Sequence, residues 1–320
     1  MKLQNISYIL SFLLWSSIAQ SHDVRVPTTI GELPLEKISH NIYLVHAPLQ
    51  GINEINEGFI ANTGFIVTNT GVVVIDPGSS VQIGRKLLEK IAEVTDNPVT
   101  AVINTHVHGD HWLGNQAVVE KFPDAVIYAH EKMIERLNRG EGEQWLEVVQ
   151  SLTKGAVLGT KVVVPNVGLK GGELIKFGDT DLEIYYKGKA HTDTDIMIEV
   201  KTEKTLFLGD IVMVGRISSQ AQDSDIKGQI DAIKFALDTM NKTFIPGHGK
   251  SGGRDVPEKA LSFLTDLYAS VKKYYEEGLS DFSMKERVIE DLSEYSKWSG
   301  FESIGRVISF TYLKVEEESF

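Results

Sequence analysis

Short apolar runs bounded by turn residues predict β-strands in the first third of the chain. These runs are rich in β-branched or aromatic side chains, and Gly, Asn or Pro lies near most of them. They are residues 42–45, 64–67, 72–75 and 99–104. Between the last two, the apolar residues of 81–94 recur at helical spacing until Asn97 and Pro98 end the pattern. The pattern therefore predicts a helix that connects two strands.

The same alternation of strands and helices continues to about residue 245. Helices are expected over 112–122 and 131–149, with a strand at 125–128 between them. After Pro165 the cycle restarts, with strands near 182–186, 195–200, 205–208 and 243–245 and a helix over 227–240. Two successive halves of this kind predict an α/β fold in which two sheets pack together and helices cover their outer faces.

The C-terminal part of the chain has a helical pattern without strands. From Val256 onward, Leu261, Leu264 and Leu267 share one helical face and polar residues lie off it. We therefore expect a main domain over 20–253 and a C-terminal helical extension over 254–320. The extension is interpreted as a cover for the core or a homodimer surface, and no chemistry is assigned to it.

The first nineteen residues predict a secretory signal peptide. Lys2 is their only charge, residues 6–15 are mostly apolar, and the small residues Ser17 and Ala19 suit a cleavage site. A membrane anchor is the alternative, but this apolar run is too short for a helix that crosses a bilayer. We expect a secreted or periplasmic protein with no stable membrane insertion after the segment over 1–19 is removed.

Composition narrows the classes of partner and of metal site. Lys and Arg number 32 against 44 Asp and Glu, so the net charge is 32 − 44 = −12, and no basic cluster appears that would bind a nucleic-acid backbone. A small-molecule substrate is expected instead. Because the chain contains no cysteine, any metal site must use histidines and carboxylates.

Seven candidate metal ligands follow predicted strands in four separate segments. Three of the nine histidines lie in the sequence Thr-His-Val-His-Gly-Asp-His at 105–111. The candidates are His106, His108, Asp110, His111, His191, Asp210 and His248. Imidazole and carboxylate together suit zinc, iron or manganese. A lone His-x-His is commonly a surface feature, but four such segments, each with a nearby glycine, favour a metal site.

This constellation resembles the motif series of the metallo-β-lactamase superfamily from about residue 42 to 249. The resemblance implies a four-layer αββα sandwich with two divalent metal ions, zinc being favoured over iron or manganese. It implies that His106, His108 and His191 hold the first ion, that Asp110, His111 and His248 hold the second, and that Asp210 bridges them. Some zinc lactamases have a cysteine where Asp210 stands, so the pattern is closer to glyoxalase II. The stretches 190–195 and 209–216, with the helical tail, also resemble the exported quinoprotein-relay metallohydrolases.

The resemblance implies hydrolysis of a thioester, ester or lactone of a small molecule by a hydroxide shared between the ions. Asp110 is expected to be catalytic by orienting the proton of that nucleophile. A periplasmic zinc β-lactamase and a mononuclear iron dioxygenase acting on persulfides are the alternatives. A metal carrier is a third, and a nuclease is disfavoured because no basic domain is inserted between the halves.

Five further residues receive secondary hypotheses. Asp76 could accept a hydrogen bond from a ligand histidine, or could simply be a turn residue before Pro77. Thr192 could support His191 in the same way. Arg216 and Lys189 could bind a substrate carboxylate, whereas Trp112 is expected in the core rather than in the pocket.

Overall fold

In a computed structural model, which describes residues 33–319, seven strands form the first sheet. Their order in the sheet is their order along the chain. The predicted signal peptide lies outside the described residues. The strands are β1 (Leu35–Lys37), β2 (Ile42–Val45), β3 (Thr63–Thr68), β4 (Gly71–Ile75), β5 (Val99–Ile103), β6 (Val126–His130) and β7 (Val167–Leu169). Strands β1 to β4 are antiparallel, and β4 to β7 are parallel.

The second sheet contains five strands in the order β12-β11-β10-β9-β8. They are β8 (Leu174–Phe177), β9 (Thr180–Tyr185), β10 (Met197–Val200), β11 (Thr205–Met213) and β12 (Thr243–His248). Neighbours are antiparallel except β11 and β12, which are parallel. A parallel pair brings the carboxyl ends of both strands to one edge of the sheet.

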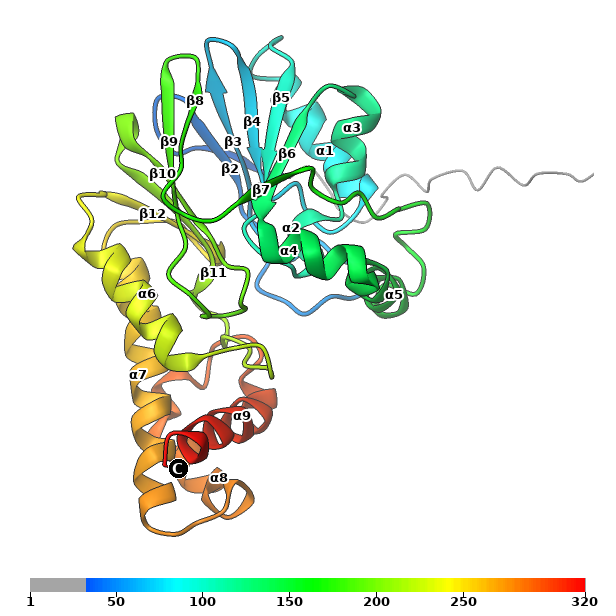
Figure 1. The fold of residues 1–320 in the computed structure, drawn as a ribbon. Coiled ribbons are helices and arrows are strands. Elements are labelled where there is room, and N and C mark those ends of the chain that lie inside the picture. The colour runs from blue at the N-terminus through cyan, green and yellow to red at the C-terminus, as the bar shows by residue number, and fades with distance from the viewer. Residues whose placement is uncertain (1–32, 320) are drawn as a thin grey trace, which may run out of the picture.

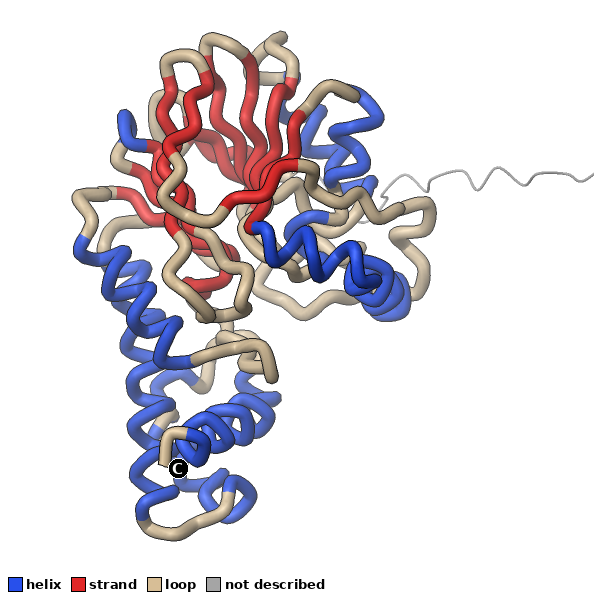
Figure 2. The backbone as a smooth tube through the Cα atoms, viewed as in Figure 1, coloured by secondary structure: helices blue, strands red, loops and turns tan. Residues whose placement is uncertain are grey.

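Helices cover the outer faces of both sheets, as Figures 1 and 2 show. The helices α1 (Val81–Ala92) and α3 (Asn115–Lys121) pack on the first sheet through residues such as Leu87 and Val74. On the second sheet lie α6 (Ile226–Asp238) and α7 (Asp255–Glu276). Between the sheets, apolar side chains from both, including Ile66 and Ile198, form a continuous buried layer. The predicted αββα sandwich is therefore confirmed.

Two predicted helices are divided differently in the structure. The expected helix over 131–149 consists of α4 (Glu131–Arg136), a π-helical turn (Leu137–Glu141) and α5 (Gly142–Leu152). Gly140 in that turn has φ +96°, a conformation that requires glycine and breaks the helical path. The expected helix over 112–122 is replaced by α2 (Gly109–Trp112) and α3.

Three strands, β1, β7 and β8, have no counterpart in the sequence prediction. They are only three or four residues long, and each lies at the edge of its sheet. Their side chains are mostly exposed or half-buried, so no clear apolar alternation marks them. Pairing with a neighbouring strand is what makes these segments strands.

After the second sheet the chain is helical, in α7, α8 (Asp281–Asp291) and α9 (Ile304–Glu317). Short 3₁₀ turns occur at Lys201–Glu203, Ser293–Tyr295 and Phe301–Ser303. The apolar faces of these three helices share one buried cluster with the outer face of the second sheet. The boundary between 253 and 254 stays a prediction. Within residues 33–319, every helix is too short or too polar to cross a membrane.

Candidate metal centre

The turn after β5 and the first turn of α2 position four of the candidate ligands. His106 and His108 lie in the loop that follows Ile103, and Asp110 and His111 lie inside α2. All four follow a strand, as predicted, but Asp110 and His111 do so within a short helix. The helical turn begins when His111 N–H donates to the His108 carbonyl at 3.1 Å. It places four ligand side chains within six residues around one point.

The second half supplies three ligands, and two of them lie within strands rather than after them. His191 lies in the loop between β9 and β10, whereas Asp210 is inside β11 and His248 is the last residue of β12. The pairing of β11 with β12 shifts at Gly209, which has φ +50°. Such an irregularity redirects the following side chain. A Cβ at Gly247 would lie 1.9 Å from Asp210 Oδ1, so only glycine leaves room for this carboxylate.

All seven predicted ligands meet at the edge of the sandwich, in two adjacent groups. One group contains His106, His108, His191 and Asp210, and the other contains Asp110, His111 and His248. Within each group the potential ligand atoms lie within 4.8 Å of one another. In the first group, His191 Nε2 lies 2.9 Å from His108 Nδ1. In the second, Asp110 Oδ2 lies 3.4 Å from His248 Nε2 and 3.7 Å from His111 Nε2.

Asp210 lies between the two groups. Its Oδ2 is 3.7 Å from His106 Nε2 and 3.5 Å from His191 Nε2, both in the first group. The same oxygen is 3.2 Å from His248 Nε2, and Oδ1 is 3.2 Å from His111 Nε2. A carboxylate in this position can contribute an oxygen to each group.

Hydrogen bonds on the outer side of three histidines fix their tautomers. His111 Nδ1 donates to Asp76 Oδ2 at 2.8 Å, and His248 Nδ1 donates to the Ile60 carbonyl at 2.7 Å. The Thr105 hydroxyl donates to Asp76 and therefore accepts from His106 Nδ1 at 3.0 Å. All three Nε2 atoms consequently face the centre. The contacts of Asp76 therefore support the hypothesis that it accepts a hydrogen bond from a candidate ligand histidine.

The inward-facing atoms are suited to a cation. His106 Nε2, His111 Nε2 and Asp210 Oδ1 are buried without a hydrogen-bond partner in the described part of the chain. Burial lowers the pKa of His106 and lowers that of His191 to about 3, which keeps both imidazoles neutral. Neutral imidazoles with ionised carboxylates are the protonation states that metal ligands require. The residues present therefore fit divalent metal ions.

In the second group, nearby carboxylates raise the pKa values of the histidines. Burial opposes protonation of His111, but Asp210, Asp110 and Asp76 outweigh it and raise its pKa well above the usual value. The pKa of His248 is also raised, with Asp210 as the main opposing influence to burial. Burial alone would raise the pKa of Asp110, but His111 and His248 hold it below its usual range. Metal binding here should displace these protons.

We expect Asp76→Asn to weaken metal binding by the second group about 10- to 100-fold, as losses of such outer hydrogen bonds do. An amide lacks the charge that holds His111 in the required tautomer. Competition against a zinc chelator measures the effect, with exposed Asp96→Asn as the control. Unchanged affinity would show that Asp76 is only a turn residue.

The prediction that Thr192 bonds to the His191 ring is wrong. Thr192 N–H and its hydroxyl donate to Asp195 at 2.7 and 2.9 Å, and neither bonds to the His191 ring. Asp195 is buried, which raises its pKa to about 8. Thr192 therefore shapes the turn that carries His191 and acts on the ring only through the backbone.

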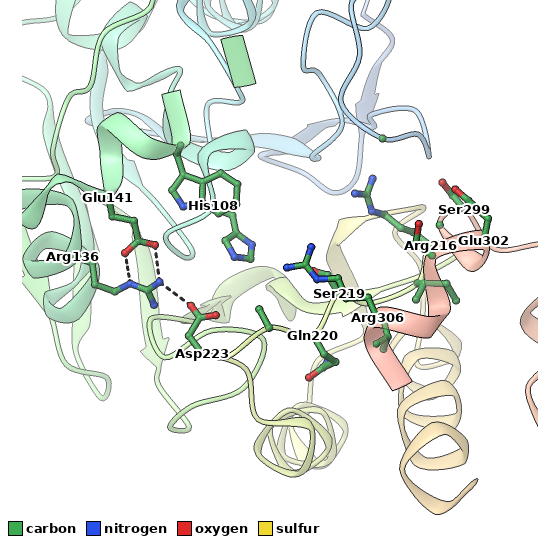
Figure 3. A pocket seen from close by; sticks show the side chains of 17 residues that line it. His108, Arg136, Glu141, Arg216, Ser219, Gln220, Asp223, Ser299, Glu302 and Arg306 are labelled. Carbon is green, nitrogen blue, oxygen red and sulfur yellow. Dashed lines mark hydrogen bonds and ion pairs between the residues drawn. The ribbon is translucent and has the colours of Figure 1, made fainter. Parts of the chain in front are cut away.

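A cavity of about 550 Å³ opens beside His108 (Figure 3). Trp145, which the sequence analysis missed, lines it, and its ring centroid lies 4.7 Å from that of His108. Trp112 is fully buried in the core, as predicted. Arg216 lines the cavity, whereas Lys189 lies outside it and donates to the Gln222 carbonyl.

The C-terminal extension also contributes to the cavity, although no chemistry was assigned to it from sequence. Ser299, Ser303 and Arg306 form part of the wall. In Figure 3 the side chains of Arg216 and Arg306 lie on the same side of the cavity and extend toward it. Nothing in the helical spacing of this segment distinguishes Arg306 from a surface arginine.

Comparison with known proteins agrees with this fold and site. A family model described as the metallo-beta-lactamase superfamily matches residues 56–248. A "Metallo-beta-lactamase type 2" of Bacillus sp. (strain 170) is 24% identical over 260 residues, covering 78% of this chain and 90% of the relative. A "Hydroxyacylglutathione hydrolase" of Francisella philomiragia is 22% identical over 234 residues, covering 72% and 77%.

Solved structures give the same result for the fold. A metallo-beta-lactamase from Pontibacter korlensis superposes with a TM-score of 0.59 at 22% identity, covering 73% of this chain and 99% of that one. The family match spans both halves of the sandwich and includes all seven candidate ligands. The chain therefore belongs to the metallo-β-lactamase superfamily and is a metal-dependent hydrolase.

Proposed function

We propose that this protein is a hydrolase with two divalent metal ions, zinc being favoured, that cleaves a C(=O)–X bond of a small molecule. The observation that carries the proposal is Asp210, whose two oxygens lie within 3.2–3.7 Å of histidines from both ligand groups. His106, His108 and His191 would hold one ion, and Asp110, His111 and His248 the other. A carboxylate shared between two closely spaced ions would offset part of the repulsion between them.

When bound, such ions polarise a carbonyl group and lower the pKa of water. The chain's own contribution is orientation. Asp110, a member of the second group, presents a carboxylate that can accept a hydrogen bond from the attacking water and fix its direction. The outer hydrogen bonds of His106, His111 and His248 hold the rings so that their Nε2 atoms do not rotate away.

We further propose that the substrate carries an anionic group away from the scissile bond. Arg216 bonds only to the Gln50 carbonyl, and Arg306 contacts only the Phe310 ring, so within residues 33–319 neither guanidinium has a carboxylate partner. Both line the cavity next to His108. Charged groups that remain unpaired in a binding cavity suit a substrate of opposite charge.

We expect Arg306→Met to reduce preference for an anionic substrate. The measurement compares kcat/KM for an aryl thioester bearing a free carboxylate with that for its neutral amide. A lost charge-assisted contact of about 1.5–3 kcal/mol corresponds to roughly a 10- to 100-fold change in this ratio. Arg139→Met, at an exposed position outside the cavity, is the charge-matched control. An unchanged ratio would remove Arg306 from the substrate site.

The metal content per chain, measured together with hydrolysis of thioester and cephalosporin probes, tests the main proposal. Two equivalents of zinc with thioester turnover, lost on chelation and restored by zinc, would support it. Turnover of the cephalosporin alone would favour a β-lactamase, an alternative that the Bacillus relative's name supports. One equivalent of iron with oxygen uptake on a persulfide would overturn the proposal in favour of a dioxygenase.

We also propose export of the mature chain from the cytoplasm. The support is the apolar segment at residues 6–15 with small residues at 17 and 19. N-terminal sequencing of the protein recovered from the periplasm or the medium should begin after Ala19. Recovery of the intact N-terminus from the cytoplasm would contradict export.

A further inference from the structure

Arg136 joins three separate segments around the cavity. It is the last residue of α4, and its guanidinium contacts the carboxylates of Glu141, Asp193 and Asp223. Figure 3 shows the contacts with Glu141 and Asp223. The distances are 2.6 Å from Nε to Glu141, 2.5 Å from Nη1 to Asp193 and 2.8 Å from Nη2 to Asp223. A second nitrogen, Nη2, also donates to Glu141 at 2.6 Å, so that pair is bidentate.

The three carboxylates belong to parts of the chain with different roles. Glu141 ends the π-helical turn that leads into α5, the helix that carries Trp145. Asp193 is two residues beyond His191, and Asp223 lies in the loop before α6 and lines the cavity. Arg136 therefore connects the helices between β6 and β7 of the first sheet with loops of the second.

The loop of Asp223 is itself fastened to the His191 loop. The Ser224 hydroxyl donates to the His191 carbonyl at 2.7 Å, and Asp225 N–H donates to the Ala190 carbonyl at 2.7 Å. Asp193 and Asp223 thus hold the same metal-ligand loop from two sides. A displacement of Arg136 would be transmitted to the backbone of His191.

The charges in this cluster do not balance. One guanidinium faces three carboxylates, and their side chains are only 22–31% exposed. Without the guanidinium, the three like charges would repel one another in a partly desolvated site where Coulomb interactions exceed those in water. The segment that carries Glu141 would then move away from the loops of Asp193 and Asp223, which stay joined to each other through Ser224 and Asp225.

We propose that Arg136 is a positioning residue that holds the His191 loop and the α4–α5 helices in the arrangement required by the first metal group. Arg136 lines the cavity, but within residues 33–319 its ion-pair partners are Glu141, Asp193 and Asp223 rather than the candidate ligand side chains. It acts through Asp193 on one side and through Glu141, before the helix of Trp145, on the other. This inference rests on the proposed metal site but not on any particular substrate.

The test measures zinc affinity by competition against a chromophoric chelator. We expect Arg136→Met to lower the affinity of one of the two zinc-binding steps, the one that belongs to the first metal group, about 10-fold or more, as disruption of supporting contacts does. Arg139→Met is the matched control, because Arg139 is three residues away, 75% exposed and paired only with Glu135. The control should retain the affinity of the unmodified protein.

A second variant separates charge balance from a purely structural effect. Arg136→Met combined with Asp223→Asn removes one of the three repelling carboxylates and should recover most of the lost affinity. Simple loss of packing at Arg136 would not be repaired by changing Asp223. If Arg136→Met does not fold, Arg136→Lys takes its place, because one ammonium cannot make the bidentate contact and should give a smaller loss with the same rescue.

Two outcomes would overturn the proposal: zinc affinity of the Arg136 variant equal to that of Arg139→Met, or an affinity loss that Asp223→Asn leaves unrepaired. The unfolding temperatures of the metal-free variants are measured as well. A purely structural role of Arg136 would lower these temperatures without a loss of zinc affinity that Asp223→Asn restores. Absence of turnover on every acyl probe would instead refute the proposed hydrolysis and leave the result on Arg136 intact.

Discussion

Asp110→Asn should lower kcat by roughly 10²- to 10⁴-fold, the range that a positioned proton-accepting group contributes. The physical reason is the loss of a carboxylate at the point where His111 and His248 face it, at 3.7 and 3.4 Å. An amide has nearly the same shape, but its nitrogen donates where an acceptor is required. The first metal group contains no atom of Asp110 and should retain its metal.

The measurement pairs steady-state kinetics on the best acyl probe with metal analysis of the same preparation. Asp124→Asn, an exposed change of the same chemistry, serves as the control. Full activity of the purified Asp110 variant would refute the role assigned to this carboxylate. Loss of all metal would show instead that Asp110 is needed to assemble both groups.

The second large effect is expected for Asp210→Asn. Asp210 faces four ligand histidines, and its oxygens are the contacts common to both groups. Loss of an outer hydrogen bond already costs 10- to 100-fold in affinity or activity. Loss of a direct, shared carboxylate should exceed that, so we expect more than about a 10²-fold fall in turnover and a fall in bound metal.

Metal content decides how the Asp210 result is interpreted. A fall from two equivalents to one or fewer, with Asp238→Asn unaffected at its exposed position, would support a shared ligand. A variant that keeps both equivalents and full turnover would contradict it. Asp210 would then be a buried partner of the histidines without a bridging role.

The central strands and the first helix could be predicted because local patterns determine them. Strands β2, β3 and β4 are largely buried on both faces, so their sequences are short, mostly apolar runs rich in β-branched and aromatic residues. Helix α1 has one buried face and a Ser80 cap whose hydroxyl accepts from Ile83 N–H. Here local sequence and tertiary environment favour the same structure.

The candidate ligand set could be selected from the sequence, because histidine and aspartate in glycine-bearing turns are unusual enough to recognise by residue type, and the structure brings all seven residues together. Their placement was less accurate. Asp210 and His248 lie within strands since the irregular pairing of β11 and β12 redirects them, and that pairing joins segments more than thirty residues apart in sequence. No local pattern reports such a register shift.

The sequence by itself therefore determined the layered fold and the seven candidate ligands, and left two interpretations of Asp76 open. Only the tertiary structure decided that Arg306 lines the cavity, that Trp145 lies against His108, and that Arg136 joins three carboxylates. The physical reason is the range of the interactions. Periodicity and residue type are properties of the local sequence. The ion pair between Arg136 and Asp193, which are 57 positions apart, forms only after both sheets have packed together.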